Sequence, residues 1–248
     1  MGSAITSFFR PFLLALGFLT RLAPAGMASS EELSASCRWY PLAGAVLGAA
    51  LLLCLLPILA WADSPAAAAW IYVLASVWLT RGLHLDGLAD LADALGSGKT
   101  GPAFREVLKD SRLGAFGCLA LVLALGGQMV MAGTCLAGDR LAPLFFAPVF
   151  ARCLPLFLAG LAPVWPGSRL GAILAASRGG RPPALACLLP GPFCLGLIPF
   201  LLALAASCAL LAFLVRVARR EGGYNGDFAG ALIIGGECAA LAAAALGG

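Results

Sequence analysis

Long apolar runs, each close to the length of a membrane span, make up most of this chain. Spans are predicted at about 41–61, 115–137 and 228–247, because each run approaches the roughly 20 apolar residues that cross a bilayer as a helix. The run 66–80 returns from the first of these, so that the two form a hairpin, and a further span is expected at about 141–164. The pattern predicts an all-α, polytopic integral membrane protein with about six to seven membrane segments.

Two apolar runs do not fit a simple span. Residues 8–25 are interrupted by two prolines and by Arg21, which leaves about 14 clean residues and predicts a tilted or re-entrant helix. Residues 184–215 are too long for one straight span, too short for two, and broken by the prolines at 190–192. We expect a broken, hairpin-like segment there, which returns Arg216 to the side of the membrane from which the segment starts.

One long polar segment, 81–113, separates the apolar runs. Its cations are Arg81, Lys99, Arg105, Lys109 and Arg112. Cytoplasmic loops of membrane proteins carry an excess of such residues, so this loop is predicted to face the cytoplasm. No separate soluble domain is visible, and residues 1–248 are interpreted as a single membrane domain.

The composition supports this interpretation and excludes others. Hydrophobic residues make up 61% of the 248 residues and charged residues only 11%, which is not the composition of a soluble domain. The net charge of +4 is dispersed among loops and does not indicate a nucleic-acid-binding face. The nine cysteines form no CxxC pair and are typical of small buried packing residues rather than metal ligands.

Three aspartates follow the run 66–80 closely. If the segment from Asp86 onward is helical, Asp86, Asp90 and Asp93 share one face at spacings of four and three residues. A solvated acidic helix face is the ordinary explanation for such a pattern. Carboxylates this close to the membrane interior are energetically unfavourable, however, and usually have a function there. Binding a divalent cation through the carboxylate oxygens would be such a function. The pattern therefore favours a magnesium site.

A second polar group stands directly before the run 115–137. Lys109, Asp110, Ser111 and Arg112 could hold phosphate oxygens while the carboxylate assists a metal. The alternative is a positively charged membrane anchor, which explains the two cations but not Asp110.

A third group begins the last apolar run. Gly223 allows close backbone approach to an anion, and Asn225 and Asp227 add oxygen ligands two residues apart. Glu237 lies deeper in the same run, where an unpaired carboxylate is expensive. We expect it to form a purely structural pair with Arg152, which lies in the middle of another predicted span.

Taken in order, these residues resemble a known family. The motifs that carry the resemblance are Phe18-Leu19-Thr20-Arg21-Leu22, Gly82-Leu83-His84-Leu85-Asp86-Gly87-Leu88-Ala89-Asp90 with Asp93, Lys109-Asp110-Ser111-Arg112-Leu113-Gly114, and Gly223-Tyr224-Asn225-Gly226-Asp227. Their order and separations, over nearly the whole chain, are similar to those of cobalamin synthase, the adenosylcobinamide-GDP ribazoletransferase family.

The resemblance implies a magnesium-dependent enzyme of a bacterial inner membrane with its site on the cytoplasmic side. Such an enzyme joins α-ribazole, or its 5′-phosphate, to adenosylcobinamide-GDP and releases GMP, with the ribazole 5′-hydroxyl expected to attack the cobinamide-attached phosphorus. The metal ligands implied are Asp86, Asp90, Asp93 and Asp227. Substrate contacts are expected from Arg21, Lys109, Ser111, Arg112, Gly223 and Asn225. Catalytic roles are expected for Asp86, Asp90 and Asp110.

The general base stays open between an aspartate and His84. A continuous helix would place His84 about 160° from Asp86, so that it would reach the site only if the helix starts after it. Two other functions also remain open: a CDP-alcohol type phosphotransferase, which would share the spaced aspartates, and a cation transporter, which would place its acidic residues at the bilayer midplane. Whether the chain forms a homo-oligomer is open as well.

Overall fold

The computed structural model describes residues 2–24, 26–61, 64–177 and 180–247. Its longer helices are α1 (Gly2–Leu19), α3 (Tyr40–Trp61), α4 (Pro65–Thr80), α7 (Ala115–Ala137), α8 (Ala142–Leu158), α12 (Leu197–Glu221) and α13 (Gly226–Leu246). Its shorter helices are α2 (Ser30–Ser36), η1 (Cys37–Trp39), α5 (Leu83–Gly96), α6 (Pro102–Leu108), α9 (Arg169–Ala176), α10 (Arg181–Leu188) and α11 (Gly191–Leu195). Apart from two isolated bridges, the regular structure of the described residues is helical, as the sequence predicts.

The chain is a multi-pass membrane protein. Within the described residues four helices are long and apolar enough to cross a membrane, or five if α4 and α5, which meet at 90°, count as one broken span. The predicted six to seven segments are somewhat too many. The difference arises because α8 has only 17 residues, and because α1, α10 and α11 do not provide further spans of sufficient length.

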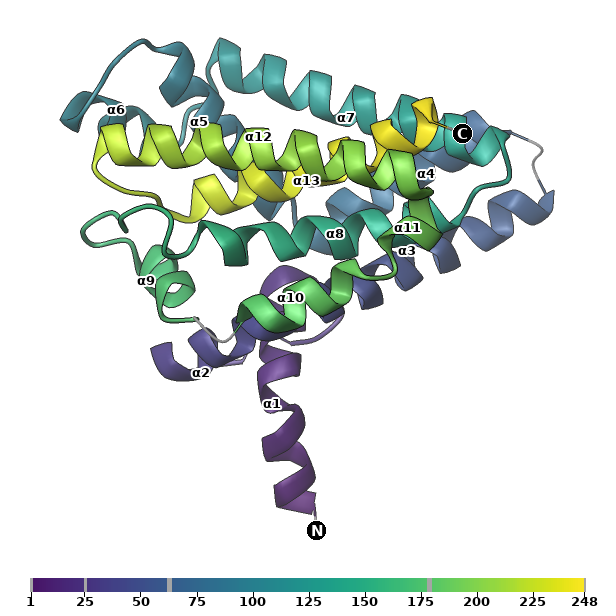
Figure 1. Ribbon diagram of the computed structural model, residues 1–248, viewed down its shortest axis with the longest axis horizontal. Coiled ribbons are helices and arrows are strands. Elements are labelled where there is room, and N and C mark those ends of the chain that lie inside the picture. Colours follow the sequence, from purple (N-terminus) through teal and green to yellow (C-terminus); the bar gives the residue numbers. More distant parts are fainter. Residues whose placement is uncertain (1, 25, 62–63, 178–179, 248) are drawn as a thin grey trace.

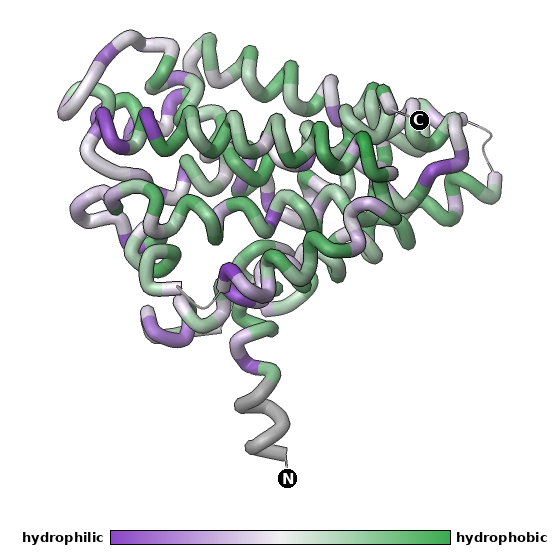
Figure 2. Tube along the Cα trace, viewed as in Figure 1, coloured by the Kyte–Doolittle hydropathy of each residue, from purple (hydrophilic) through white to green (hydrophobic). Residues whose placement is uncertain are grey.

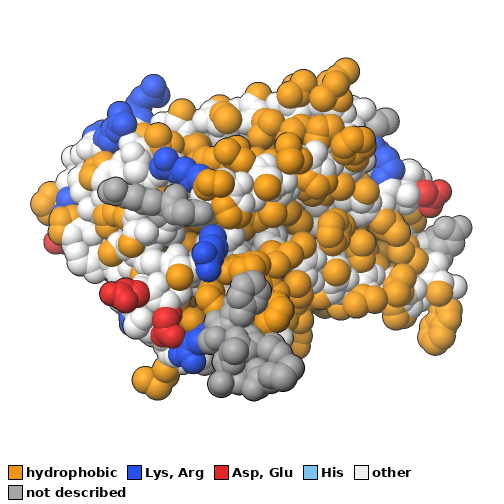
Figure 3. All heavy atoms as spheres, turned by 60° about the horizontal axis from the view of Figure 1, so that its bottom comes forward, with side chains coloured by type: hydrophobic (Ala, Val, Ile, Leu, Met, Phe, Trp, Pro, Cys, Tyr) orange, Lys and Arg blue, Asp and Glu red, His pale blue; other side chains and the backbone are white. Residues whose placement is uncertain are grey.

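The long helices run side by side along the longest axis of the molecule, while α1 lies nearly perpendicular to them (Figure 1). Hydrophobic residues dominate the helix bodies, and hydrophilic residues gather at one end, near the α12–α13 turn, and around α2 (Figure 2). The surface carries a broad hydrophobic belt with charged side chains toward its ends (Figure 3). We call the end that holds the α12–α13 turn, α5, α6 and α9 the polar end.

The interior of the bundle is built around α8 and α13. In the 18-residue apolar stretch of α13, 72% is buried within the protein, compared with 22% in that of α7 and 28% in that of α12, so α13 is an interior helix. Along α3, Gly44 and Gly48 lie against the backbone carbonyls of Pro148 and Phe145. Because a side chain at either glycine would collide with α8, this small-residue spacing is what allows the close contact of the two helices.

The predicted pair of Arg152 and Glu237 is confirmed. Arg152 Nη1 lies 2.9 Å from Glu237 Oε1, and Gln128 donates to Glu237 Oε2 at 3.2 Å. Arg152 is completely buried and Glu237 nearly so. A charge in these apolar surroundings is unfavourable without such a partner. The pair is therefore an interior contact that joins α8 to α13.

The predicted break within 184–215 is also confirmed. The segment is divided into α10, α11 and α12, with the interruptions at residues 189–190 and at Gly196, whose φ is +92°. The chain turns there, and α12 returns to the polar end (Figure 1). Arg219 and the start of α13 therefore lie at the same end as α5.

Candidate active site

The first element of the site is the sharp bend between α4 and α5. Arg81 and Gly82 both have positive φ angles, +59° and +66°. Glycine adopts this conformation freely but arginine does not, so Arg81 needs stabilising contacts. Its guanidinium supplies them by donating to the carbonyls of Gly17 and Phe18 at the end of α1, at 2.9 and 2.7 Å.

Arg21 makes the reciprocal contact from the α1 side. Its Nε donates to the Trp78 carbonyl at 2.8 Å, its backbone N–H donates to Leu79 at 2.7 Å, and its guanidinium lies 5.6 Å from the Trp78 ring centre. Each arginine thus satisfies carbonyls at the end of the other helix. Sequence reasoning gave Arg21 a substrate role and Arg81 none, and the structure places both where they join α1 to the bend.

The bend directs α5 across the start of α13. A Cβ on Gly87 would lie only 2.9 Å from the Cα of Asp227, and one on Gly230 would lie 3.0 Å from the His84 carbonyl. Glycine at these two positions is therefore what allows the two helices to touch. This contact brings Asp227 beside the α5 aspartates, as the sequence motifs imply.

Two cavities meet at Asp86. The larger, about 750 Å³, is lined by Asp86, Asp90, Ser111 and Arg81 together with glycine and apolar residues. The smaller, about 110 Å³, is lined by Asp86, Asp227 and His84. Asp90 lies within electrostatic reach of Asp86, Asp227 and Asp93, so several negative charges share this part of the polar end. Crowded carboxylates favour a bound cation.

Asp93 differs from the other carboxylates. Its Oδ2 accepts a hydrogen bond from the Gly114 N–H and its Oδ1 from the Gly117 N–H, both at 2.8 Å. It therefore caps the start of α7, a role that spacing along α5 did not predict. Each oxygen keeps a further lone pair, and a ligand role for Asp93 stays a prediction.

Asn225 orders the first turn of α13. Its Oδ1 accepts from the Asp227 N–H at 3.2 Å, and its Nδ2 donates to Asp227 Oδ2 at 2.6 Å. Asn225 thus fixes the orientation of a carboxylate at the smaller cavity.

Gly223 has φ +144°, and its backbone lies against Trp165. Its N–H donates to the Ala218 carbonyl at 2.7 Å, so this donor is already used within the protein. The turn requires glycine at position 223. Because the Gly223 N–H is already bonded, it is not available for the predicted contact with substrate.

The segment after α6 presents cations next to the larger cavity. Arg112 donates from Nε to both carboxylate oxygens of Asp110 and from Nη2 to Oδ2 at 2.6 Å, and this guanidinium lowers the pKa of the Asp110 carboxyl to about 2. The Arg112 side chain is 88% exposed, Lys109 is exposed at the end of α6, and Ser111 lines the cavity. Asp110 therefore meets Arg112 rather than the α5 aspartates.

His84 lies within α5, which starts at Leu83, so the condition for a helix beginning after His84 is not met. His84 nevertheless lines the same smaller cavity as Asp86. It is 5% exposed, and its Nε2 has no hydrogen-bond partner among the described residues.

Sequence reasoning missed the contacts that hold the loop after α5. Glu221 Oε2 accepts from the Gly101 N–H at 2.6 Å, and Arg105 donates to the Glu221 carbonyl at 2.9 Å while lying 5.0 Å from the Trp165 ring centre. Glu221 is 3% exposed. These contacts fix the 81–113 segment to the end of α12, and no local pattern links residues so far apart.

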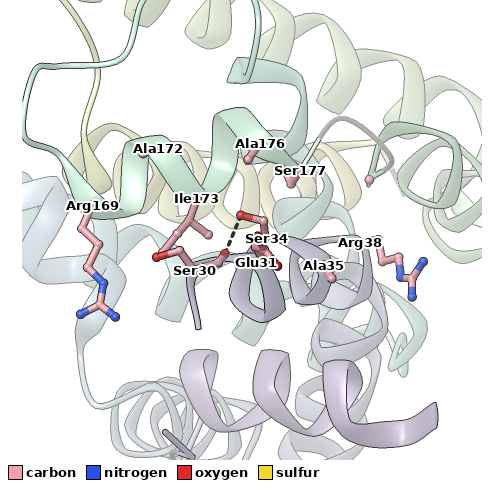
Figure 4. A pocket seen from close by; sticks show the side chains of 11 residues that line it. Ser30, Glu31, Ser34, Ala35, Arg38, Arg169, Ala172, Ile173, Ala176 and Ser177 are labelled. Carbon is pink, nitrogen blue, oxygen red and sulfur yellow. Dashed lines mark hydrogen bonds between the residues drawn. The ribbon is translucent and has the colours of Figure 1, made fainter. Parts of the chain in front are cut away.

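A further cavity of about 630 Å³ lies between α2 and α9. Figure 4 shows Arg169 and Arg38 at its two sides, pointing away from one another, with small side chains such as Ser34 and Ala172 between them. None of the predicted site residues lines it.

The described residues contain no group of three or more His, Cys, Asp or Glu side chains arranged as a ready-made metal cluster. The carboxylates of Asp86, Asp90 and Asp227 are nevertheless hard oxygen donors, and these residues line the two adjoining cavities. They are therefore the part of the described chain best suited to a hard cation.

The fold and the site define the class of protein: a polytopic membrane protein with an acidic site and adjoining cations at one end of its helix bundle. The family model described as cobalamin-5-phosphate synthase matches residues 11–245. An adenosylcobinamide-GDP ribazoletransferase of Nitratidesulfovibrio vulgaris (strain DP4) is 45% identical over 97% of this chain and 99% of its own length. One from Leptothrix cholodnii is 39% identical over 90% of this chain and 89% of its own.

The chain therefore belongs to the cobalamin-5-phosphate synthase family, a family of transferases in cobalamin biosynthesis. This confirms the resemblance that the sequence motifs indicate. No solved structure matches the chain.

Proposed function

We propose that this chain joins α-ribazole, or its 5′-phosphate, to adenosylcobinamide-GDP and releases GMP. The observation that carries the proposal is the meeting of Asp86, Asp90 and Asp227 at two adjoining cavities, in a chain whose relatives are named adenosylcobinamide-GDP ribazoletransferase.

The reaction is a substitution at phosphorus. A ribose hydroxyl of the ribazole forms a new P–O bond to the cobinamide-attached phosphorus, the P–O bond to GMP breaks, and the hydroxyl proton passes to a base. The expected attack by the 5′-hydroxyl needs correction, because a product named cobalamin-5-phosphate has a phosphate on that oxygen. Another ribose hydroxyl must attack. Asp86 lines both cavities and is placed to accept its proton.

Mg²⁺ fits this donor set, because Asp86, Asp90 and Asp227 offer carboxylate oxygens and lack a cationic side chain as an ion-pair partner among the described residues. These three residues would hold the ion, which when bound would neutralise charge on the diphosphate and on the leaving oxygen. Asn225 holds the Asp227 carboxylate in place at 2.6 Å.

Lys109, Ser111 and Arg112 are proposed to contact the diphosphate. Ser111 lines the larger cavity, and the exposed Arg112 follows it directly in the chain. Its Nε and Nη2 bind Asp110, so the remaining N–H donors of its guanidinium are the ones proposed to meet phosphate oxygens. The larger substrate is therefore placed in the larger cavity.

The protein is proposed to lie in a bacterial inner membrane with the polar end in the cytoplasm, because the cations of 81–113 gather there. Single cysteines at Lys99 and Asp139, in a background without the exposed Cys54, Cys118 and Cys208, test this orientation. An impermeant maleimide added to intact cells is expected to label position 139 alone. Labelling at position 99 would place the site outside.

The direct test is GMP release by the purified protein in detergent. Adenosylcobinamide-GDP with α-ribazole and Mg²⁺ is expected to yield GMP, and a chelator is expected to stop the release. Absence of GMP with either ribazole, from protein that is folded, would overturn the proposal. A CDP-alcohol substrate serves as the comparison and is expected to give no turnover.

A further inference from the structure

We propose that Arg81 is a substrate-binding residue, whose guanidinium binds phosphate oxygens of the diphosphate-bearing substrate in the larger cavity. The inference rests on the proposed function and deepens it, because it adds a substrate contact that the sequence motifs did not predict. Arg81 then has two tasks, one in the bend between α4 and α5 and one in the site.

Arg81 brings a positive charge to the larger cavity. Among the described residues that line this cavity, Arg81 is the single cation, and Asp86 and Asp90 are the anions. None of the ion pairs among the described residues involves Arg81 or either of these carboxylates. The cavity therefore presents both signs of charge without an ion pair between them, which suits a diphosphate that is bound together with a divalent cation.

The guanidinium of Arg81 is fixed in place but only partly used. Its Nη2 donates to the carbonyls of Gly17 and Phe18, at 2.9 and 2.7 Å, whereas its Nε and Nη1 donate to none of the described residues. Arg81 is exposed, and Phe18 lines the same cavity, so the contact with Phe18 holds the guanidinium at the cavity wall. The N–H groups of Nε and Nη1 are therefore available to phosphate oxygens.

The backbone of Arg81 indicates that an arginine side chain is needed at this position. Its φ of +59° and ψ of +19° lie in the left-handed region, which glycine adopts freely and arginine does not. Residues held in such conformations cluster at active sites and ligand clamps. The contacts with the end of α1 offset the strain, and they also orient the side chain at the cavity that holds the carboxylates.

The position of Arg81 relates the diphosphate to the reacting groups. The Asp86 N–H donates to the Gly82 carbonyl at 2.9 Å, so only the first turn of α5 separates Asp86 from the bend. Phe18, whose carbonyl Arg81 contacts, and Asp86 both line the two cavities. A phosphate bound to Arg81 is therefore held where the cavities meet, next to the carboxylate that is proposed to accept the proton.

The test measures KM for each substrate in variants of Arg81. Arg81→Gln removes the charge, and KM for adenosylcobinamide-GDP is expected to rise about 10- to 100-fold, the value of one hydrogen bond to a charged group, with KM for α-ribazole unchanged. Arg81→Lys keeps the charge and is expected to show a smaller rise, of about three- to tenfold. Arg81→Gly suits the φ of +59° and should fold most readily, with the same rise as Arg81→Gln.

Two other arginines separate contact with the diphosphate from a general effect on the bend. Arg219, exposed at the polar end, also donates to a carbonyl, that of Leu161 at 2.8 Å, but lines neither cavity. Arg219→Gln is therefore the matched control with unchanged KM. Arg21→Gln removes the reciprocal contact with Trp78 without removing a cation from the cavity, so KM for adenosylcobinamide-GDP should rise far less than in Arg81→Gln.

A measurement on the unmodified protein does not depend on how the variants fold. Phenylglyoxal modifies exposed arginines, and the masses of the resulting peptides give the extent of modification at each position. Inorganic pyrophosphate with Mg²⁺ is expected to protect Arg81 and to leave the reactivity of Arg219 unchanged.

Reactivity of Arg81 that pyrophosphate leaves unchanged would overturn the inference. So would a KM for adenosylcobinamide-GDP that is unchanged in Arg81→Gln, or that rises equally in Arg21→Gln, because the effect would then come from the bend. Absence of GMP release by the unmodified protein counts against the proposed function instead, whereas GMP release with unaffected Arg81 variants counts against the role of Arg81 alone.

Discussion

Asp227 and Glu237 lie on the same helix, α13, and their charges are treated in opposite ways. Glu237, near the middle of the helix, is paired with Arg152 at 2.9 Å and accepts a further bond from Gln128. The Asp227 carboxylate, in the first turn, accepts a hydrogen bond from the neutral Asn225, has no cationic partner among the described residues, and lines a cavity shared with Asp86. A charge that is paired inside the bundle stabilises the fold, whereas the crowded carboxylates at its edge, which form no salt bridge among the described residues, are available to a ligand.

The largest effect is expected from removing the charge of Asp86, which lines both cavities. Asp86→Asn keeps the size of the side chain but removes the charge, so kcat is expected to fall by about 10³-fold, while the unfolding temperature is unchanged or raised because repulsion is relieved. GMP release and thermal unfolding in detergent measure the two effects. Asp139→Asn, at the opposite end of the bundle, is the control with normal turnover. Normal magnesium-dependent turnover of Asp86→Asn would remove the aspartate site.

The interior pair should respond in the opposite sense. Glu237→Gln leaves the Arg152 charge buried without its counter-ion, and we expect it to lower the free energy of unfolding by about 3–5 kcal/mol. Turnover per folded molecule should be retained, and replacing the pair together by Arg152→Met and Glu237→Leu should recover most of the stability. Thermal unfolding of the single and double variants measures this. A stable but inactive Glu237→Gln protein would instead give Glu237 a part in the chemistry.

Asp93 stands between these two cases. Because it caps α7 through Gly114 and Gly117, Asp93→Ala is expected to cost about 1–2 kcal/mol of stability. Asp93→Asn keeps one acceptor, so it should be more stable than Asp93→Ala, and its kcat should fall far less than that of Asp86→Asn. A loss of turnover as large as that of Asp86→Asn, in a folded protein, would restore Asp93 as a metal ligand.

The smallest effect is expected at the exposed Asp110–Arg112 pair. Arg112 holds the pKa of Asp110 at about 2, below its ordinary value, so the carboxylate is ionised at neutral pH and its charge is lost only as the pH falls toward about 2. The Asp110 carboxylate is therefore fully ionised between about pH 6 and pH 9, and its titration should cause no change in turnover over that range. Arg112→Lys keeps the charge but removes the fork, and KM for adenosylcobinamide-GDP should rise by about two- to tenfold. An unchanged KM would leave Arg112 as a membrane anchor.

Much of the fold could be predicted from local patterns. The apolar runs predict α3, α7 and α13 to within a few residues, because burial in a membrane demands continuous apolar sequence. The break near Pro190 followed from proline chemistry, and the pairing of Arg152 with Glu237 followed from the cost of a lone charge in an apolar run. The span count came out too high, because α8 is shielded by other helices and can be short.

The candidate site could be predicted from the sequence only in part. Helical spacing alone places Asp86 and Asp90 on one face, and the family resemblance links them to Asp227. Spacing did not predict that Asp93 turns to cap α7, or that Arg21 and Arg81 exchange contacts across the bend. These contacts join residues far apart in the chain, and neither partner has a local signal for the other.

The sequence by itself determined the class of protein, the membrane segments and the residue types of an acidic site, because these follow from composition and from spacing within one helix. Only the tertiary structure decided which carboxylates share a cavity, and that His84 lines the smaller cavity together with Asp86 and Asp227. The physical reason is that cavities and charge neighbourhoods arise where helices pack. Here that packing depends on the close approach of α5 to α13 at Gly87 and Gly230, which no single stretch of sequence contains.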